Sequence, residues 1–231
     1  MKKNKIFIAC DTSNLDLVKK IINQTKTKEL EIIPKFGLQF FYSQKGRKFL
    51  ENFDKEFFLD LKINDIKQTA ISAVDSLKDL KKCRYITVHA NGGLEMLKAV
   101  KKKASEINKN LKILGVTVLT SLNNKSLKEI GHTRSVEQLV LKQAGLIKKV
   151  GLHGIVLSAK EAKIVKKKYN NLFTVTPGIR LPGDRTDDQA RVVTPYDALK
   201  INKVNAIVMG RSLIRGNIKN NIKKLIDHLN K

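Results

Sequence analysis

Short apolar segments alternate with amphipathic segments along the whole chain, and this pattern limits the fold more than any other feature. Eight segments are predicted to be strands, because each is short, largely apolar and rich in β-branched or aromatic residues. They are residues 5–10, 30–35, 56–62, 84–89, 111–118, 152–158, 172–177 and 205–210. The segments between them repeat apolar residues at helical spacing, as in "NLDLVKKIIN" and "LEMLKAVKKKASEI". Apolar strands that alternate with amphipathic helices indicate a parallel sheet covered by helices.

Eight such units predict an α/β fold of the (β/α)8 type, the TIM barrel. The length of 231 residues fits one barrel, so we expect a single domain over residues 1–231. A doubly wound open sheet is the alternative fold. That fold normally carries a glycine-rich turn after its first strand, where this chain has "CDTSN".

The N-terminus and the two cysteines predict a cytoplasmic protein. The basic start is followed by only five apolar residues before Asp11, too few for a secretion signal or a membrane span. Cys10 and Cys83 form neither a disulfide framework nor a metal-ligand pattern. We therefore expect reduced thiols, no membrane association and no metal site.

The formal net charge of +25 raises nucleic acid as an alternative partner, because basic proteins attract phosphate backbones. The lysines are scattered along the whole chain, however, and aromatic residues make up only 6% of it, so no stacking platform for single strands is evident. Charge alone is a weak signal for nucleic-acid binding. A basic surface would also attract a phosphorylated small substrate.

Charged residues stand at the ends of the first three predicted strands, where barrel enzymes place their active sites. Asp11 follows the first strand and Lys35 ends the second. Asp60 and Lys62 lie in the third strand, and Asp65 follows just beyond it. Alternation along a strand predicts that Asp60 and Lys62 point the same way. A buried ion-pair network of purely structural value is the alternative interpretation.

Two segments after the last two strands suggest a phosphate site. "PGIR" (177–180) and "GRSLI" (210–214) lie where barrels often bind phosphate through backbone N–H groups at a helix start. Gly210 would allow close approach, and Arg180 and Arg211 could each offer a bidentate fork. Alternatively, the glycines only form turns and the arginines are solvated.

The segment between the seventh strand and the next helix, residues 179–195, is long, polar and predicted to form a lid or binding loop that carries Gln189. Alternatively, this segment is a surface loop without a function. His89 ends the fourth strand, but no other His or Cys has ligand spacing to it, so we assign it no catalytic role.

Several motifs together carry a resemblance to a known family. "DLKINDI" is similar to the Asp-x-Lys-x-x-Asp signature of orotidine 5′-phosphate decarboxylases of the bacterial type. "ACDTSN", "PKFGLQFFYSQKG", "VHANGG", "VTVLTS", "LSAKE", "VTPGIR" and "VMGRSLI" resemble further family segments and occur in the family's order across essentially the whole chain. The one departure noted is Lys67, where the family often has proline.

The resemblance implies a homodimeric enzyme without metal or cofactor that converts orotidine 5′-monophosphate to UMP at the end of pyrimidine biosynthesis. It implies that Lys62 delivers a proton, that Asp60 lies beside the substrate carboxylate, and that Asp65 completes the charge network and reaches the neighbouring subunit's site. Asp11 and Lys35 would bind the ribose.

Thr120 would line the shared site, and the phosphate would be held by Gln189, Arg180, Gly210 and Arg211. The full set of substrate-binding residues implied is Asp11, Lys35, Asp60, Leu61, Lys62, Ile63, Asn64, Asp65, Ile66, Lys67, Gln68, Thr69, Thr120, Arg180, Gln189, Gly210 and Arg211.

A second group with the same barrel and motif, the sugar-phosphate decarboxylases and aldolases, is the nearest alternative function. Those enzymes resemble this chain but bind magnesium through an acid at the end of the second strand. Here that position is Lys35, a cation that would repel the metal. The substitution favours the orotidylate interpretation.

Overall fold

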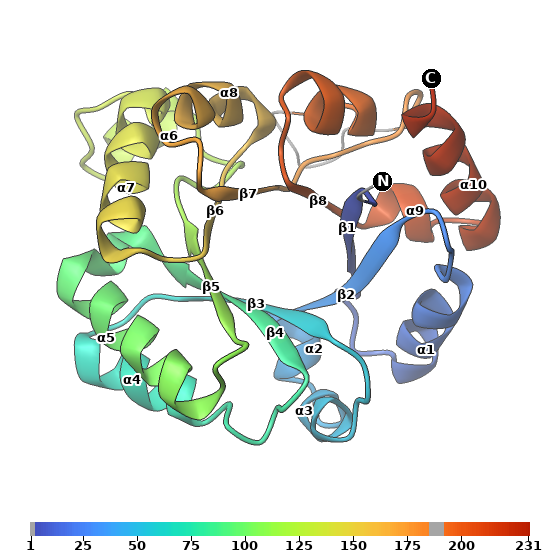
Figure 1. The fold of residues 1–231 in the computed structure, drawn as a ribbon, viewed down its shortest axis with the longest axis horizontal. Helices are drawn as coiled ribbons and strands as arrows, with labels where there is room; N and C mark the ends of the chain where they lie inside the picture. The colour runs from blue at the N-terminus through green and yellow to red at the C-terminus, as the bar shows by residue number, and fades with distance from the viewer. Residues whose placement is uncertain (1–2, 185–191) are drawn as a thin grey trace.

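The computed structural model, which describes residues 3–184 and 192–231, is a closed barrel of eight parallel strands (Figure 1). Each strand pairs with the next one in the chain, and β8 closes the barrel on β1. The strands are β1 (Lys5–Ala9), β2 (Glu31–Gly37), β3 (Phe57–Ile63), β4 (Cys83–His89), β5 (Lys112–Val116), β6 (Gly154–Val156), β7 (Phe173–Thr176) and β8 (Ala206–Met209). The predicted barrel and its eight strands are therefore confirmed, and the open sheet is excluded.

Helices form the outer ring seen in Figure 1. They are α1 (Leu15–Gln24), α2 (Leu38–Phe41), α3 (Gly46–Glu51), α4 (Lys67–Asp75), α5 (Gly93–Ile107), α6 (Asn124–Glu129), α7 (Val136–Val150), α8 (Ala159–Lys168), α9 (Arg211–Ile214) and α10 (Ile218–Leu229), with a 3-10 turn η1 (Ala90–Gly92) and a π-helical turn η2 (Asp197–Ile201).

The boundaries of α7 illustrate how local sequence sets the helices. Ser135 and Gln138 form a capping box at its start, and Gly151 ends it with a left-handed φ of 71°. Both devices satisfy backbone groups that a helix end leaves without partners. The helix after β3 begins at Lys67, two residues beyond Asp65, and ends at Asp75.

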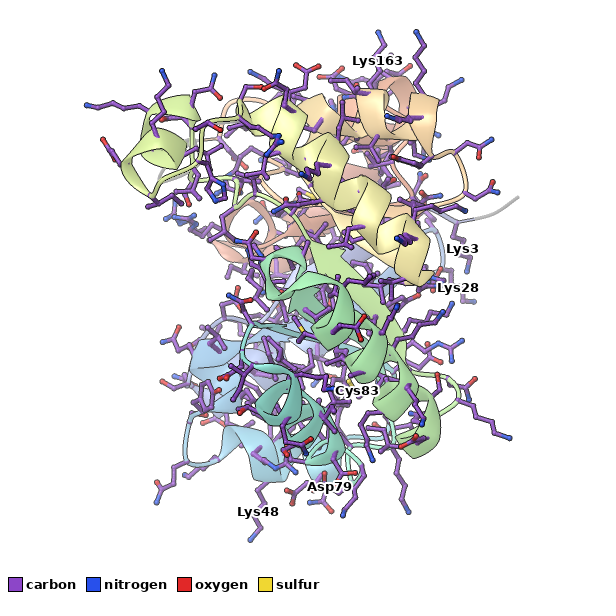
Figure 2. The ribbon with its side chains drawn as sticks, turned by 90° about the vertical axis from the view of Figure 1, so that its left-hand side faces the viewer. Lys3, Lys28, Lys48, Asp79, Cys83 and Lys163 are labelled. Atoms are coloured by element: carbon purple, nitrogen blue, oxygen red, sulfur yellow. The ribbon has the colours of Figure 1, made fainter. Side chains whose placement is uncertain are left out.

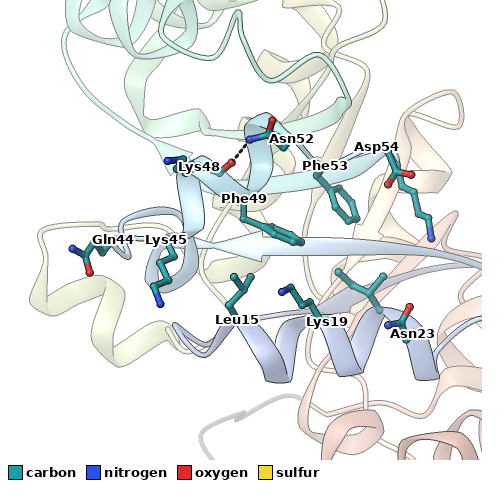
Figure 3. A pocket seen from close by; sticks show the side chains of 12 residues that line it. Leu15, Lys19, Asn23, Gln44, Lys45, Lys48, Phe49, Asn52, Phe53 and Asp54 are labelled. Carbon is teal, nitrogen blue, oxygen red and sulfur yellow. Dashed lines mark hydrogen bonds between the residues drawn. The ribbon is translucent and has the colours of Figure 1, made fainter.

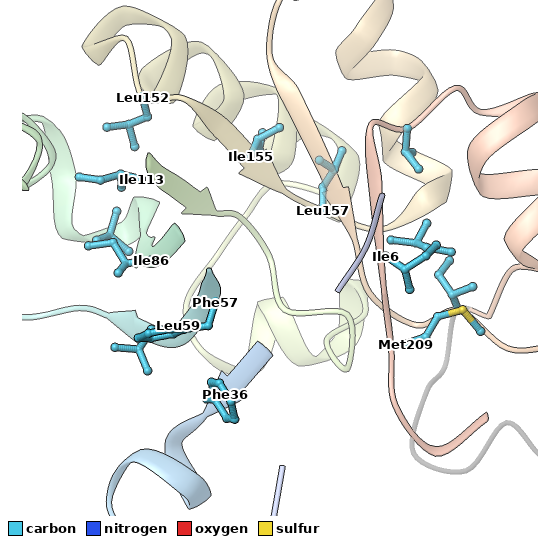
Figure 4. Packing of buried hydrophobic residues seen from close by; sticks show 14 of the residues in the cluster. Ile6, Phe36, Phe57, Leu59, Ile86, Ile113, Leu152, Ile155, Leu157 and Met209 are labelled. Atoms are coloured by element: carbon cyan, nitrogen blue, oxygen red, sulfur yellow. The ribbon is translucent and has the colours of Figure 1, made fainter. Parts of the chain in front are cut away.

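Two apolar layers build the core, because successive strand residues face opposite sides of the sheet. The barrel interior is filled by Phe7, Ile33, Phe58, Tyr85, Leu114, Val175 and Ala206. The outer layer packs the strands against the helices, as Figure 4 shows for Phe36, Phe57 and Ile86. The floor of the barrel is thus a packed core, and an open site can exist only at an end of the barrel.

Figure 2 shows lysines such as Lys48, Lys28 and Lys163 pointing outward from different parts of the molecule. In this view the labelled lysines come from different segments and are not gathered in one stripe. Among the residues described, no helix is long and apolar enough to cross a membrane.

Candidate active site

Strands β2 and β3 each place a charged side chain next to the apolar interior, on the side of the strands' carboxyl ends. Lys35 follows the interior residue Ile33 by two positions on β2, and Asp60 follows Phe58 by two on β3. Both therefore face inward at the carboxyl end of the barrel, where barrel enzymes have their active sites. Asp11 reaches the same place from the segment after β1.

These side chains form a chain of alternating charge. The Nζ of Lys35 lies 2.8 Å from both carboxylate oxygens of Asp11 and 3.6 Å from Oδ2 of Asp60. The same Asp60 oxygen accepts a hydrogen bond of 2.9 Å from Nζ of Lys62. Acid and base thus follow each other from Asp11 to Lys62, and each inner member contacts two opposite charges.

The neighbouring opposite charges keep the buried side chains of Lys35 and Asp60 ionised. Burial alone would lower the pKa of Lys35, but the charges of Asp60 and Asp11 outweigh it and raise that pKa. Burial would likewise raise the pKa of Asp60. The charges of Lys35 and Lys62, with hydrogen bonds from Lys62 and Thr87, hold it below its usual value. The mouth therefore holds fixed charges at neutral pH.

Lys62 does not reach Asp60 by simple strand alternation. Its φ of 50° lies in the left-handed region, which a side chain with a Cβ seldom adopts. The register between β3 and β4 also shifts between Leu59 and Ile63. The end of β3 is thus a bulge that turns the Lys62 side chain toward the mouth, where it remains 37% exposed.

Asp65 stands apart from the chain of charges formed by its own subunit. It is exposed, and its Oδ1 accepts a 2.7 Å hydrogen bond from the backbone N–H of Ile66. Within residues 3–184 and 192–231, no ion pair joins Asp65 to Lys62. Exposure changes along the predicted substrate-binding segment, since Leu61 and Ile63 are half-buried and residues 64–69 are all exposed.

Beside the charged chain lies a cavity of about 190 Å³ at the barrel mouth. Asp60 and Lys62 line one side of it, and Thr120 lines it from the segment after β5. Its other walls are apolar and consist of Phe58, Val116, Val118, Leu119, Val156, Leu157, Pro177 and Val208. The cavity is therefore suited to a small, mostly apolar group that carries a charge on the side of Asp60 and Lys62.

A second cavity, of about 250 Å³, joins the two predicted phosphate segments. Arg180 and Arg211 line it, and Arg180 is buried. Gly210, just before α9, passes close to β1, since a Cβ there would lie 3.2 Å from the Cβ of Ala9. Gln189 falls in residues 185–191, the middle of the predicted lid over residues 179–195, and these seven residues lie outside the described part of the chain.

Sequence reasoning did not identify several residues of these sites. Arg215, Ser212 and Asn221 also line the arginine cavity. Thr87 on β4 contacts the charged chain. Thr87 could have been found by alternation, because it lies two residues after the interior Tyr85, whereas Asn221 comes from α10 and no local pattern marks it.

His89 follows Thr87 by two residues and lies near Lys62. Burial and the charge of Lys62 lower the pKa of His89, which favours a neutral imidazole at neutral pH. Among the described residues, no three His, Cys, Asp or Glu side chains form a group that could hold a metal ion.

A cavity of about 600 Å³, larger than either of these two, lies elsewhere, between α1 and α3 (Figure 3). Its apolar floor includes Leu15, Phe49 and Phe53, and lysines such as Lys45 and Lys48 stand at its rim. None of the charged residues of the barrel mouth lines it. Size alone therefore does not locate the reactive site of this molecule.

A closed barrel with fixed charges at its mouth and an arginine-lined cavity after β7 and β8 is typical of enzymes that act on phosphorylated substrates. Comparison with known proteins agrees. The model of the Orotidine 5′-phosphate decarboxylase / HUMPS family matches residues 4–223, and the chain belongs to this family.

Individual relatives are similar over nearly their whole length. The orotidine 5′-phosphate decarboxylase of Malacoplasma penetrans is 36% identical over 94% of each chain. That of Buchnera aphidicola is 38% identical over 96% of this chain and 92% of its own. The crystal structure of orotidine 5′-phosphate decarboxylase from Lactobacillus acidophilus superimposes with a TM-score of 0.80 at 27% identity and covers 100% of both chains.

Proposed function

We propose that this chain decarboxylates orotidine 5′-monophosphate to UMP, the last step of pyrimidine nucleotide biosynthesis. The observation that carries the proposal is the alternating chain of Asp11, Lys35, Asp60 and Lys62 at the barrel mouth. Family membership and the names of the similar proteins support it.

The chemistry explains why such charges are needed. Loss of CO2 breaks the bond between C6 and the carboxyl carbon, and the electron pair stays on C6 in the plane of the ring. The ring carbonyls do not delocalise that pair, so the site must stabilise it with charges fixed in advance. The ammonium of Lys62 faces the developing charge and then donates its proton to C6, after which Lys62 regains a proton from water.

Asp60 supports this step in two ways. Its carboxylate accepts the hydrogen bond from Lys62 and so aims the ammonium. It also lies beside the place that the departing carboxylate would occupy. Lys35, which contacts Asp60 from the other side, and Asp11, which pairs with Lys35, are the groups that we assign to the ribose hydroxyls.

The arginine cavity would take the phosphate. Arg180 and Arg211 supply charge-assisted hydrogen bonds there, and Gly210 allows the backbone to approach the phosphate oxygens. We assign Gln189 to the same group on the basis of the family motif. Binding energy from the phosphate, far from C6, can hold the pyrimidine ring in the reactive position.

We also propose a homodimer with two shared sites. Exposed apolar side chains follow the carboxyl ends of three strands at the mouth: Leu38 after β2, Ile66 after β3 and Leu119 after β5. Exposed apolar side chains gathered at one end of a barrel favour contact with a second copy. Asp65 stands in this rim, where its carboxylate can reach the Lys62 of a neighbouring subunit. Thr120 and the exposed residues 64–69 would line the shared site.

Two further assignments accompany this function. Residues 1–231 act as one domain, since the eight strands close on themselves. A cytoplasmic location is favoured by Cys10 and Cys83, which are free, buried thiols. Burial raises the pKa of Cys10 to about 12, so the thiol stays protonated. Such inert thiols are common in reducing compartments.

The nearest alternative, a magnesium-dependent sugar-phosphate decarboxylase or aldolase, belongs to the same family group. Against it stands Lys35, whose ammonium lies between Asp11 and Asp60, where a cation would be repelled. On the basis of the family resemblance, we assign neither metal nor cofactor to the proposed reaction.

An ultraviolet assay of orotidylate loss, with and without a chelator, tests the proposal. We expect turnover that the chelator does not change. Turnover lost on chelation would favour the magnesium-dependent group. No turnover, together with tight DNA binding at moderate salt, would favour a nucleic-acid-binding protein.

A further inference from the structure

Thr87 lies beside the last two residues of the charged chain, Asp60 and Lys62. It is fully buried on β4, and alternation from the interior residue Tyr85 turns its side chain inward at the mouth. Its Oγ1 lies 2.8 Å from Oδ1 of Asp60 and 2.8 Å from the backbone N of Lys62. One hydroxyl therefore contacts both Asp60 and Lys62.

The direction of these hydrogen bonds follows from the groups involved. The backbone N–H of Lys62 can only donate, so the Thr87 oxygen accepts from it. The single hydroxyl proton of Thr87 is then free to donate to Asp60, whose carboxylate is an acceptor. The second Asp60 oxygen accepts from Nζ of Lys62. Both Asp60 oxygens are thus held, and the carboxylate is restrained from rotating.

The backbone at Lys62 needs such a restraint. A φ of 50° is disfavoured for lysine, and the register shift between Leu59 and Ile63 interrupts the regular pairing with β4. The Thr87 side chain supplies the acceptor that the Lys62 N–H would otherwise lack inside the bulge. It therefore ties the strained backbone to the same carboxylate that aims the Lys62 ammonium.

We propose that Thr87 is a positioning residue for catalysis, which sets the Lys62 ammonium and the Asp60 carboxylate relative to each other by hydrogen bonds to both. The inference rests on the proposed decarboxylase function. Thr87 acts through Asp60 and Lys62 and does not line the arginine cavity, so its loss affects the chemical step more than phosphate binding.

The test replaces the hydroxyl while keeping the shape of the side chain. Thr87→Val should lower kcat roughly ten- to hundredfold, as expected when hydrogen bonds to a charged group are lost, and should change KM by no more than about twofold. Thr87→Ser keeps the hydroxyl and should retain most of the wild-type kcat. Thr176→Val is the matched control, because Thr176 is fully buried on β7 and its Oγ1 has no hydrogen-bond partner among the described residues.

Hydrogen–deuterium exchange over residues 58–66 gives a second readout that does not depend on activity. Exchange there should accelerate in Thr87→Val but not in Thr176→Val, because only the first change frees the bulge. If Thr87→Val does not fold, Thr87→Cys, whose S–H is a weak donor, takes its place with the same expectations.

The outcomes separate this inference from the function on which it rests. A wild-type protein without orotidylate turnover contradicts the proposed function, and the exchange experiment then decides the role of Thr87 in the bulge. A folded Thr87→Val or Thr87→Cys protein with wild-type kcat and unchanged exchange overturns the positioning role. An equal loss of kcat in Thr87→Ser and Thr87→Val overturns it as well, since the hydroxyl would then not matter.

Discussion

The two halves of the barrel mouth differ in chemistry although they are built from the same repeating unit. The half formed by β1 to β4 carries the charged chain from Asp11 to Lys62. The half formed by β5 to β8 offers apolar side chains such as Val116, Val156 and Val208 to the cavity, and its arginines line a separate cavity. Both halves rest on one continuous apolar layer inside the barrel.

The difference indicates a division of labour between reaction and binding. Charges that face one another in the first half are fixed before substrate arrives, which is what electrostatic catalysis requires. Under the proposed function, the second half would give the pyrimidine ring an apolar wall and the phosphate a separate cavity lined by arginines. Substitutions in the first half should therefore lower kcat, and substitutions in the second half should mainly raise KM.

Removal of the Lys62 side chain should have the largest effect on the charged half. We expect Lys62→Ala to lose roughly a thousandfold or more in turnover, because it removes both the proton donor and the facing charge. Circular dichroism should show an intact fold. The control is Lys128→Ala, which removes an exposed lysine on α6. Near-normal turnover in a folded Lys62→Ala protein would contradict the proton-donor role.

Mixed dimers test whether the charged half is complete within one subunit. Lys62→Ala and Asp65→Ala chains should each be inactive alone. In a heterodimer with shared sites, one site carries both changes and the other carries neither. Activity should therefore return to about half of the wild-type value per heterodimer.

The required control is proof of exchange, for example by native mass spectrometry of chains that differ in mass. If chains exchange and activity does not return, Asp65 acts within its own subunit and the shared-site proposal is wrong.

Arg211→Ala tests the binding half. A lost charge-assisted bond to phosphate costs about 1.5–3 kcal/mol, so kcat/KM should fall roughly ten- to hundredfold. Orotidine, which lacks the phosphate, should be affected little. Arg84→Ala is the matched control, because Arg84 lies near the amino end of β4, away from the barrel mouth, and pairs with Glu56. Equal losses for both substrates would show that Arg211 has a role other than phosphate binding.

The smallest expected effect concerns stability in acid. The pKa of Asp60 is lowered in the folded protein, so Asp60 stabilises the fold above its unfolded pKa, near 3.8, and this contribution is lost as the pH falls toward the folded pKa. In acid, unfolding lets the Asp60 carboxylate take up a proton, and Asp60→Asn removes this proton uptake. Its unfolding free energy should then fall less steeply below about pH 4, by up to about 1.4 kcal/mol per pH unit.

Urea unfolding of the wild type and of Asp60→Asn, between about pH 3 and pH 6, measures how steeply the unfolding free energy of each protein changes with pH. Parallel slopes would mean that Asp60 has the same proton affinity in the folded and unfolded states.

The sequence determined the fold and most of the candidate residues for physical reasons that act locally. Strands with apolar residues throughout can be buried only between a barrel interior and a helical layer, so eight of them predicted the closed barrel. The positions of Lys35 and Asp60 at strand ends placed them at one end of it. Gly210 and Arg211 were predicted in the same way from their place after β8.

The tertiary structure alone decided which of these residues touch. Lys35 joins Asp11 to Asp60 across three strands, and this contact depends on the register of β1, β2 and β3. The sequence predicted an acid–base–acid network within "DLKINDI", but in one subunit Asp65 caps its own backbone instead. No local pattern encodes the bulge at Lys62 or its tie to Thr87, because both arise from the pairing of β3 with β4. Contacts between distant segments follow from how the closed barrel aligns its strands, and periodicity along one segment carries no information about that alignment.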